Sequence, residues 1–330
     1  MIDSAALSFA DSARAAKHFE DEFIKFLKNA LKPPLSTNAS DSRNDIDIQY
    51  GIVNAAPQNH KILDLCCGWP LFLEKLIIQL RSETPRQGEY HYVACDVNAW
   101  QEEFKRELST LEEKANGLGV KVYRLFADVS EPTLRDIVRA VYKEPFDVIL
   151  FSNALHEIPP RAVPELLFTL ISLLEDHGQL VILDPDPDWF FDTKRWVNIE
   201  HLHRLPIDWE ANGVWLPPTL YGDMLEKFGC SVKVFRANDS QTFYVLQAHR
   251  GTFDISKRVQ LIEEAKEMLK QVIKIQLQTQ VDRYIQCRKD LMSHLDLGEG
   301  EKKRLLYKAV EFFTICASQA RRVEVKQELW

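Results

Sequence analysis

The chain has 330 residues, of which 45% are hydrophobic and 27% are charged, as is ordinary for a soluble globular protein. No apolar run approaches the roughly 20 residues of a membrane span, and the N-terminus lacks both the basic and the apolar region of a signal peptide. The net charge of −8 argues against a broad nucleic-acid-binding surface, which needs clustered Lys and Arg. We therefore expect a cytoplasmic protein without a membrane partner.

Residues 1–54 are expected to form an N-terminal helix and a linker. Apolar residues recur at helical spacing from residue 4 to residue 31, which predicts an amphipathic helix. Pro33 and Pro34 end this helix. The polar stretch 36–45 follows without periodicity and predicts a linker or a loop.

Residues 55–250 carry short apolar runs that alternate with helical stretches, and several of these runs end in an acid. The first three such acids are Asp64, Asp96 and Asp128, each 32 residues after the one before, which is about the length of one strand–helix unit. Strands that alternate with helices predict a parallel sheet that is covered on both faces. The last two runs are separated only by the sequence NDSQ, so they predict an antiparallel hairpin at the sheet edge.

Residues 251–330 contain no proline and predict two long helices. One apolar stripe predicts a helix of about 40 residues, which the sequence LGEGE breaks, and a second stripe follows. Each stripe needs a partner, which is the α/β domain, the N-terminal helix or a second copy of the chain, so a homodimer through these helices is one expectation. The first stripe is Ile262, Ala265, Leu269, Ile273, Leu277, Val281, Tyr284, Cys287 and Leu291, and the second is Leu306, Ala309, Phe313, Cys316 and Ala320.

The six cysteines form no recognisable metal or redox motif. Only Cys66 and Cys67 are close in sequence, and the chain has neither a CxxC pair nor a Cys/His cluster at zinc spacing. We interpret the cysteines as reduced and mostly buried, with a redox role for the adjacent pair as the minor alternative.

The stretch ILDLCCGWP, residues 62–70, predicts a strand, a tight turn and the start of a helix. Gly68 can take the unusual dihedral angles that such a turn needs, and Pro70 suits the first turn of a helix. In an open parallel sheet, ligands bind at the carboxyl ends of the strands, where the N–H groups of a helix N-terminus also face an anionic group. The pattern GxGxxG is absent, since only Gly68 is present, so a nicotinamide-dependent enzyme is disfavoured.

This stretch resembles the first motif of class I S-adenosylmethionine-dependent methyltransferases, in which an apolar strand and an acid precede three small residues at alternate positions. Those positions are Cys66, Gly68 and Pro70, and proline at the last of them departs from the family's glycine. The stretches FDVILFSNALHEIP, LLEDHGQLVILD and LPPTLYGDMLEKFGCSVKVFR resemble later motifs of the family in the same order. The resemblance covers roughly residues 55–250 and implies a Rossmann-like, doubly wound α/β fold, with a mostly parallel seven-stranded sheet and an antiparallel C-terminal hairpin strand.

The resemblance also implies S-adenosyl-L-methionine as the cofactor. It places Asp64 in the turn near the cofactor's amino group, Asp96 at the ribose hydroxyls and Asp128 at the adenine amino group. For Asp64 the alternative is a residue that only tethers the turn, and for the other two acids it is a helix N-cap. Asn153 and Ala154 fall beside the transferable methyl group. The implied cofactor residues are Asp64, Cys66, Gly68, Asp96, Val97, Asp128, Val129, Asn153 and Ala154.

His156 and Glu157 follow the fourth predicted strand and are the candidate catalytic residues. The charge of histidine changes near neutral pH, so His156 can act as a general base, while a structural role and substrate orientation are the alternatives. Glu157 is the weaker candidate, because an acid at the start of a helix is the favoured interpretation of this residue.

The connection 185–215 carries six large aromatic residues. In the family this connection often caps the substrate pocket, where aromatic rings stack on a planar ligand or enclose a cation. A connection that folds on a small core of its own is the other interpretation. His201 and His203 alone are too few to bind a metal, so no metal is predicted. The candidate substrate residues are Trp189, Phe190, Trp196 and His201.

These observations predict an S-adenosylmethionine-dependent methyltransferase whose acceptor is an oxygen or nitrogen of a small molecule or of a polar side chain. Two alternatives stay open. Residues 254–330 carry 15 Lys or Arg and 12 Asp or Glu, which allows an RNA or protein methyltransferase that grips its substrate with helical arms. Trp69 and Pro70 in the cofactor turn allow a non-catalytic binding or scaffold protein with the same fold.

Overall fold

The computed structural model places most of the chain from residue 60 onward. The helix expected over residues 4–31 and the linker after it lie outside the described residues. The described ranges are 60–67, 71–82, 89–97, 101–152, 154–192, 214–237 and 243–326.

Seven strands form one sheet in the order β3-β2-β1-β4-β5-β7-β6. The five strands from β3 to β5 pair in parallel, whereas β7 runs antiparallel to both β5 and β6, so β6 is the edge strand of a hairpin. The order reverses between β1 and β4, which makes the carboxyl ends of these two strands the topological switch point. The predicted fold class is therefore confirmed. The strands are β1 (His60–Leu65), β2 (Tyr90–Asp96), β3 (Val120–Phe126), β4 (Phe146–Ser152), β5 (Leu174–Pro185), β6 (Cys230–Ala237) and β7 (Phe243–Arg250).

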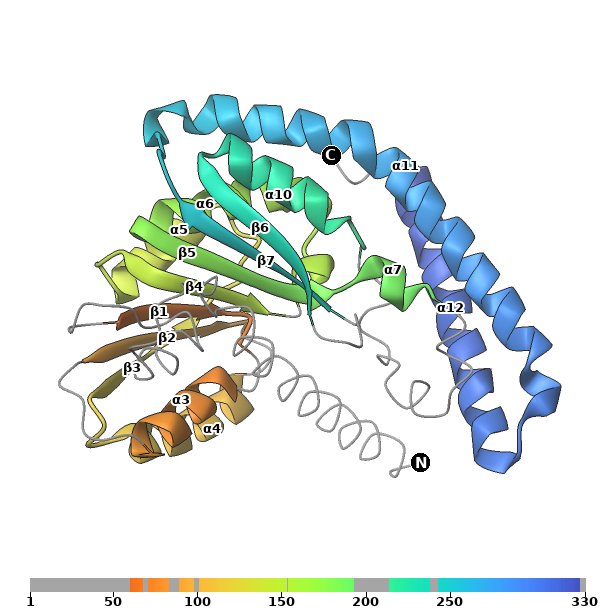
Figure 1. Ribbon diagram of the computed structural model, residues 1–330, viewed down its shortest axis with the longest axis horizontal. Helices are drawn as coiled ribbons and strands as arrows, with labels where there is room; N and C mark the ends of the chain where they lie inside the picture. The colour runs from red at the N-terminus through yellow and green to blue at the C-terminus, as the bar shows by residue number, and fades with distance from the viewer. Residues whose placement is uncertain are drawn as a thin grey trace, which may run out of the picture.

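Helices cover both faces of the sheet (Figure 1). The strands are apolar on both faces because successive side chains point to opposite sides: Leu63 and Leu65 enter one core and Ile62 enters the other. Helices α3 (Leu71–Ser82) and α4 (Gln101–Ala115) cover the second core, and α5 (Leu134–Val141), α6 (Val163–Leu173) and α10 (Pro218–Lys227) cover the first. The short elements near the strand ends are the 3-10 turns η2 (Leu155–Glu157) and η3 (Pro160–Ala162) and the helix α7 (Pro187–Phe190).

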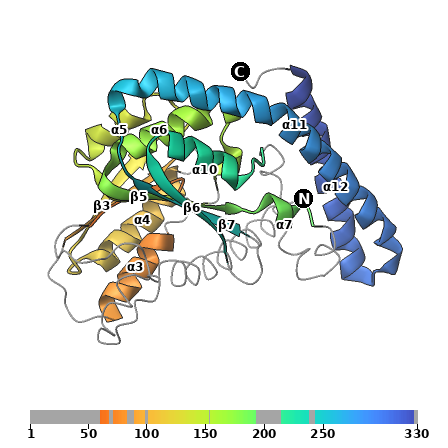
Figure 2. The same cartoon turned by 45° about the horizontal axis from the view of Figure 1, so that its top comes forward.

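The C-terminal part forms the two predicted long helices. The first, α11 (Arg258–Ser293), has 36 residues, and after a 3-10 turn the second, α12 (Gly300–Lys326), returns along it (Figures 1 and 2). All nine residues of the first stripe are buried. The stripe from Ile262 to Leu277 belongs to the core that α6 and α10 share with the sheet, whereas Val281 to Leu291 pack against α12. Half of α11 is therefore part of the sheet domain, and a homodimer through these helices stays a prediction.

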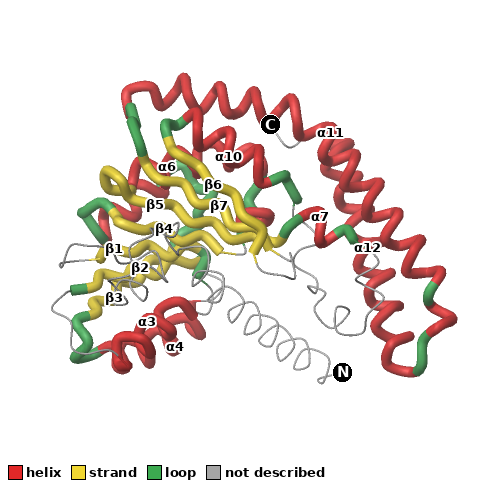
Figure 3. Tube along the Cα trace, in the orientation of Figure 1, coloured by secondary structure: helices red, strands yellow, loops and turns green. Residues whose placement is uncertain are grey.

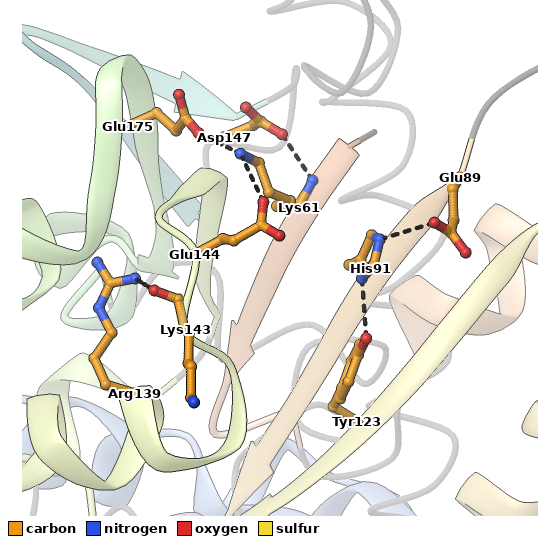
Figure 4. Close-up of polar contacts among 9 residues, drawn as sticks. All are labelled: Lys61, Glu89, His91, Tyr123, Arg139, Lys143, Glu144, Asp147 and Glu175. Carbon is orange, nitrogen blue, oxygen red and sulfur yellow. Dashed lines mark hydrogen bonds and ion pairs between the residues drawn. The ribbon is translucent and has the colours of Figure 1, made fainter. Parts of the chain in front are cut away.

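The amino ends of the strands are held by charged contacts (Figure 4). The Lys61 side chain is 12% exposed; its ammonium group pairs with the Glu175 carboxylate and lies 3.7 Å from a Glu144 oxygen. The Lys61 main-chain N–H donates to Asp147 at 2.7 Å. Burial lowers the pKa of Lys61, but the bond to Glu175 and the charges of the three carboxylates together raise it above its ordinary value. The charged side chains at the amino ends of these strands therefore stabilise the fold by binding one another.

Among the described helices, none combines the length and the apolar character that a membrane-spanning helix needs. Figure 3 shows the sheet enclosed by helices, with loops at both strand ends.

Candidate active site at the carboxyl ends of the strands

The carboxyl ends of β1 and β2 bring two buried acids together. Asp64 is 5% exposed and Asp96 is 6% exposed. In the parallel register of β1 and β2, Leu65 pairs with Cys95. Leu65 directly follows Asp64 and Cys95 directly precedes Asp96, so the two acids lie close to the same pair. Their charges interact, since Asp96 raises the pKa of Asp64. The sequence-predicted pair therefore lies at the switch point, where open α/β sheets bind ligands.

The chain leaves β1 in a left-handed turn. Cys66 has a φ of 52°, a conformation that non-glycine residues rarely adopt and that is often found at functional sites. The next N–H group, that of Cys67, donates to the Cys95 carbonyl of β2 at 3.1 Å. We expected Gly68 to take the unusual dihedral angles; the structure shows such angles at Cys66, while Gly68 lies outside the described residues.

The thiols of this turn are not activated. All six cysteines lie within the described ranges and are thiols, not disulfides, and Cys66 and Cys67 are partly buried. Burial, together with the nearby acids and Cys95, raises the pKa of both thiols well above its ordinary value. The thiolate is the reactive form of cysteine, so neither side chain has the character of a nucleophile or a redox group.

Asp64 is held by a tyrosine of the neighbouring strand. The Tyr92 hydroxyl donates to an Asp64 carboxylate oxygen, and the Tyr92 side chain is fully buried. The pKa of Asp64 is raised to about 7: burial is the largest cause, the Tyr92 bond opposes the rise, and the Asp96 charge adds to it. The sequence does not distinguish Tyr92 as a partner of Asp64, because an aromatic residue inside an apolar run looks like any other core residue.

Replacing Asp64 by asparagine (Asp64→Asn) is expected to remove a pH dependence of stability. The folded chain keeps the Asp64 proton up to about pH 7, whereas the unfolded chain releases it near pH 4, so the wild-type stability falls as the pH rises through this window. The asparagine side chain does not ionise, so from pH 4 to pH 8 the variant should gain on the order of 4 kcal/mol relative to the wild type. Urea unfolding of both proteins across that range measures the difference.

The control for this prediction is Tyr92→Phe. Because the tyrosine bond favours the ionised carboxylate, its loss should move the pH-dependent fall in stability to higher pH. Parallel stability profiles for wild type and Asp64→Asn would show that Asp64 does not titrate in this window.

Asp96 and Asp128 differ in their surroundings. An Asp96 carboxylate oxygen accepts the Val97 main-chain N–H at 2.7 Å, inside the buried strand end. Asp128 is exposed, and one of its oxygens accepts both the main-chain N–H and the hydroxyl of Ser130, at 2.8 and 2.7 Å. The carboxylate therefore stabilises a turn. The neighbouring Val129 is 3% exposed and packs in the core.

The carboxyl end of β4 carries a buried histidine–aspartate pair. His156 lies in the turn η2 and is 1% exposed; its Nδ1 lies 2.9 Å from Asp184 Oδ1, at the end of β5. The second Asp184 oxygen accepts the His156 main-chain N–H at 3.2 Å. One carboxylate thus fixes both the ring and the main chain of His156. Ala154 is buried just before this turn, and Asn153 lies outside the described residues.

An aromatic ring covers this histidine. Trp215 stacks on the His156 imidazole with the ring centroids 4.5 Å apart and an interplanar angle of 12°. The Val214 main-chain N–H donates to the His156 carbonyl at 2.7 Å, which holds the tryptophan segment in place. From the sequence, Trp215 is only one of six large aromatic residues in the connection 185–215. Its contact with His156 cannot be predicted from the sequence, because the two residues lie far apart in the chain.

Glu157, the second catalytic candidate, is exposed at the end of η2. Desolvation of its carboxyl group raises its pKa, and the charges of Asp184 and Asp96 add to the rise, while His156 opposes it. Glu157 therefore contributes to the same negative region as the two strand-end acids.

The family of the domain that carries this site can be assigned. A family model described as a methyltransferase domain matches residues 22–232, more than half of the chain. The chain belongs to the class I methyltransferase family. No curated protein matches this sequence.

Several solved structures resemble parts of this chain at low identity. An O-methyltransferase family protein from Burkholderia thailandensis is 15% identical with a TM-score of 0.41, and the match covers 59% of this chain and 52% of that chain. CurJ carbon methyltransferase is 15% identical with a TM-score of 0.43, covering 63% and 53%. PH0226 protein from Pyrococcus horikoshii OT3 is 14% identical with a TM-score of 0.39, covering 58% and 82%. This chain spans about half the length of the first two.

The candidate substrate residues lie only partly within the described residues. Trp189 and Phe190 belong to α7, directly after β5, whereas Trp196 and His201 lie outside the described residues. Within the described ranges, no group of three or more His, Cys, Asp or Glu side chains is arranged to hold a metal ion.

The sequence prediction of the site does not include Asp184, although this residue ends an apolar run in the same way as Asp64 and Asp96.

Proposed function

We propose that this methyltransferase uses S-adenosyl-L-methionine as methyl donor and methylates an oxygen or a nitrogen of a small molecule. The cofactor supplies a methyl group on a positively charged sulfur. The residues at the strand ends fit it: Asp96 offers a buried carboxylate to hydroxyl groups, and the left-handed Cys66 brings the main chain to the switch point. Desolvation is the main cause that raises the pKa values of Asp64 and Glu157, and the charge of Asp96 adds to both rises. A cationic donor bound beside these acids would favour their ionised forms.

The observation that carries the acceptor chemistry is the pair of His156 and Asp184. The His156 Nδ1–H group donates a hydrogen bond to Asp184 Oδ1, with an N···O distance of 2.9 Å, so the neutral imidazole carries its lone pair on Nε2, the atom that can take a proton. A base oriented by a buried carboxylate is the arrangement that activates a hydroxyl group or an acidic N–H group in other enzymes. An acceptor whose proton must leave during transfer therefore suits this site better than one that is already a free nucleophile.

The rest of the catalytic effect comes from alignment. Methyl transfer is an in-line displacement, and holding acceptor and donor in line removes much of its entropic barrier. The buried strand ends and the Trp215 ring also exclude water around His156.

Incubation with methyl-labelled S-adenosylmethionine tests this function. The panel of acceptors contains small phenols, carboxylic acids and amines, together with pools of RNA and of unfolded protein. We expect label to move to a small molecule and an equal amount of demethylated cofactor to form, with Asp96→Ala as the matched blank. Label found only in RNA or protein would contradict the small-molecule proposal, and no transfer to any acceptor would contradict methyl transfer itself.

A further inference from the structure

A buried glutamine of the C-terminal helix α11 binds the main chain of Trp215, the residue whose ring covers His156. Gln280 is 3% exposed, and its Oε1 accepts the main-chain N–H of Trp215 at 3.1 Å. Its Nε2 donates to the Tyr284 hydroxyl at 2.9 Å, one turn later on the same helix. Burying an amide costs free energy unless both of its ends are bonded, so these two bonds define one orientation of Gln280.

The same turn of α11 also holds the segment that leaves β5. The Tyr284 ring meets Phe191 edge to face at 5.0 Å, and the Cys287 thiol donates to the Phe191 carbonyl at 3.6 Å. Arg283 lies 3.1 Å from an Asp188 oxygen. Figure 1 shows α7 ending beside α11. One short stretch of α11, residues 280–287, therefore fixes both the chain that leaves β5 and the chain that enters α10.

Trp215 links this stretch of α11 to the catalytic histidine. Its main-chain N–H is bonded to Gln280, and its ring is stacked on His156. On the other side, Asp184 bonds both the ring and the main chain of His156. The imidazole is thus held between a carboxylate from the sheet and an indole whose position α11 sets. Helix α12 braces the same stretch of α11, since Phe313 packs against Tyr284 with the centroids 6.0 Å apart.

We propose that Gln280 is a positioning residue of the acceptor half of the site: by fixing Trp215, it keeps the His156 ring in the orientation in which Nδ1 faces Asp184 and Nε2 faces the acceptor. The long helical hairpin is then part of the catalytic unit. The inference rests on the proposed function, in which His156 takes the acceptor's proton. Gln280 is not expected to contact the methyl donor, because the acids proposed to bind the donor lie at the ends of β1 and β2.

The ring nitrogens of His156 report this directly and need no acceptor. We would label the full chain with nitrogen-15 histidine, bind the demethylated cofactor, and record the ring shifts at pH 8, assigning His156 with the His156→Gln variant. Wild type should show one tautomer, with the proton on Nδ1. In Gln280→Met, which keeps the volume and loses the bonds to Trp215 and Tyr284, the minor tautomer should rise about fivefold, the ratio that corresponds to one ordinary hydrogen bond.

Matched variants separate the inference from the proposed function. Gln278→Met lies two residues away, on the exposed face of α11 where its amide donates to Asp282, and should leave the wild-type shifts unchanged. Tyr284→Phe keeps the ring and loses the hydroxyl bonded to Gln280, so it should also raise the minor tautomer. It replaces Gln280→Met as the test if Gln280→Met does not fold. A wild-type proton on Nε2 would overturn the base role itself. A proton on Nδ1 that Asp184→Asn displaces but Gln280→Met and Tyr284→Phe do not would overturn only the positioning role.

Discussion

His156→Gln is expected to slow methyl transfer by about 10²- to 10⁴-fold, the usual contribution of a positioned general base. Glutamine cannot take up the acceptor's proton, so the loss falls on the chemical step. Asp184→Asn should cause a loss of about 10²-fold, because the amide does not stabilise a proton on Nδ1 and leaves the imidazole free to hold the wrong tautomer. Single-turnover transfer from labelled S-adenosylmethionine to the best acceptor of the panel measures both effects.

The cofactor affinity should be unchanged in both variants, since neither side chain is one of the acids at β1 and β2. His177→Gln is the matched control: this histidine is exposed at the opposite end of β5, and its replacement should leave the rate at the wild-type value. Wild-type transfer by His156→Gln would show that the acceptor arrives without a proton to lose and that the buried histidine is structural.

Gly229→Ala is expected to destabilise the fold by about 4 kcal/mol or more, in the range reserved for backbone or core disruption. Gly229 has a φ of +87°, and a Cβ atom placed there would lie 2.1 Å from the Thr252 carbonyl oxygen, which belongs to the main chain and cannot move aside cheaply. The Gly251 N–H also donates to the Gly229 carbonyl at 3.2 Å. The chain that enters β6 therefore crosses the chain that leaves β7, immediately before α11.

The control is Gly117→Ala. Gly117 has a similar φ of +83°, but nothing lies within 4 Å of the added Cβ, so only the left-handed backbone of a non-glycine residue is penalised, roughly 1 kcal/mol. Urea unfolding of the two variants separates backbone strain from collision. Equal losses of unfolding free energy in the two variants would contradict this account. They would show that the main chain at Gly229 and Thr252 moves apart to accommodate the added Cβ atom.

The sequence predicted those parts of the fold that follow from periodicity. The acids Asp64 and Asp96 were found because an apolar run that ends in an acid marks a strand end, and the nine buried residues of α11 were found because they recur at helical spacing. The start of β5 differs from the prediction: the strand begins at Leu174, which pairs with Phe146, and not near Gly178. The residues that follow Leu174 have the sequence EDHG, which is polar and looks like a turn.

Long-range contacts account for what the sequence did not predict about the site. The sequence predicts His156 as a base but not its partner, because Asp184 lies 28 residues away and meets it only when β4 and β5 pair. Gln280 lies 65 residues from Trp215 and looked like any polar residue between two stripe positions. For Asp128, a side chain engaged with Ser130 could not be told from a ligand contact by spacing alone.

Calorimetric titration of S-adenosylmethionine and of its demethylated product tests most directly whether the carboxyl ends of β1 and β2 form the donor site. We predict micromolar binding to wild type, a loss of about ten- to a hundredfold in Asp96→Ala, as expected when hydroxyl groups lose a charged partner, and unchanged binding in Asp176→Ala, whose exposed acid lies near the amino end of β5. No binding to the wild type, or equal affinity in Asp96→Ala, would contradict the placement of the cofactor at these strand ends.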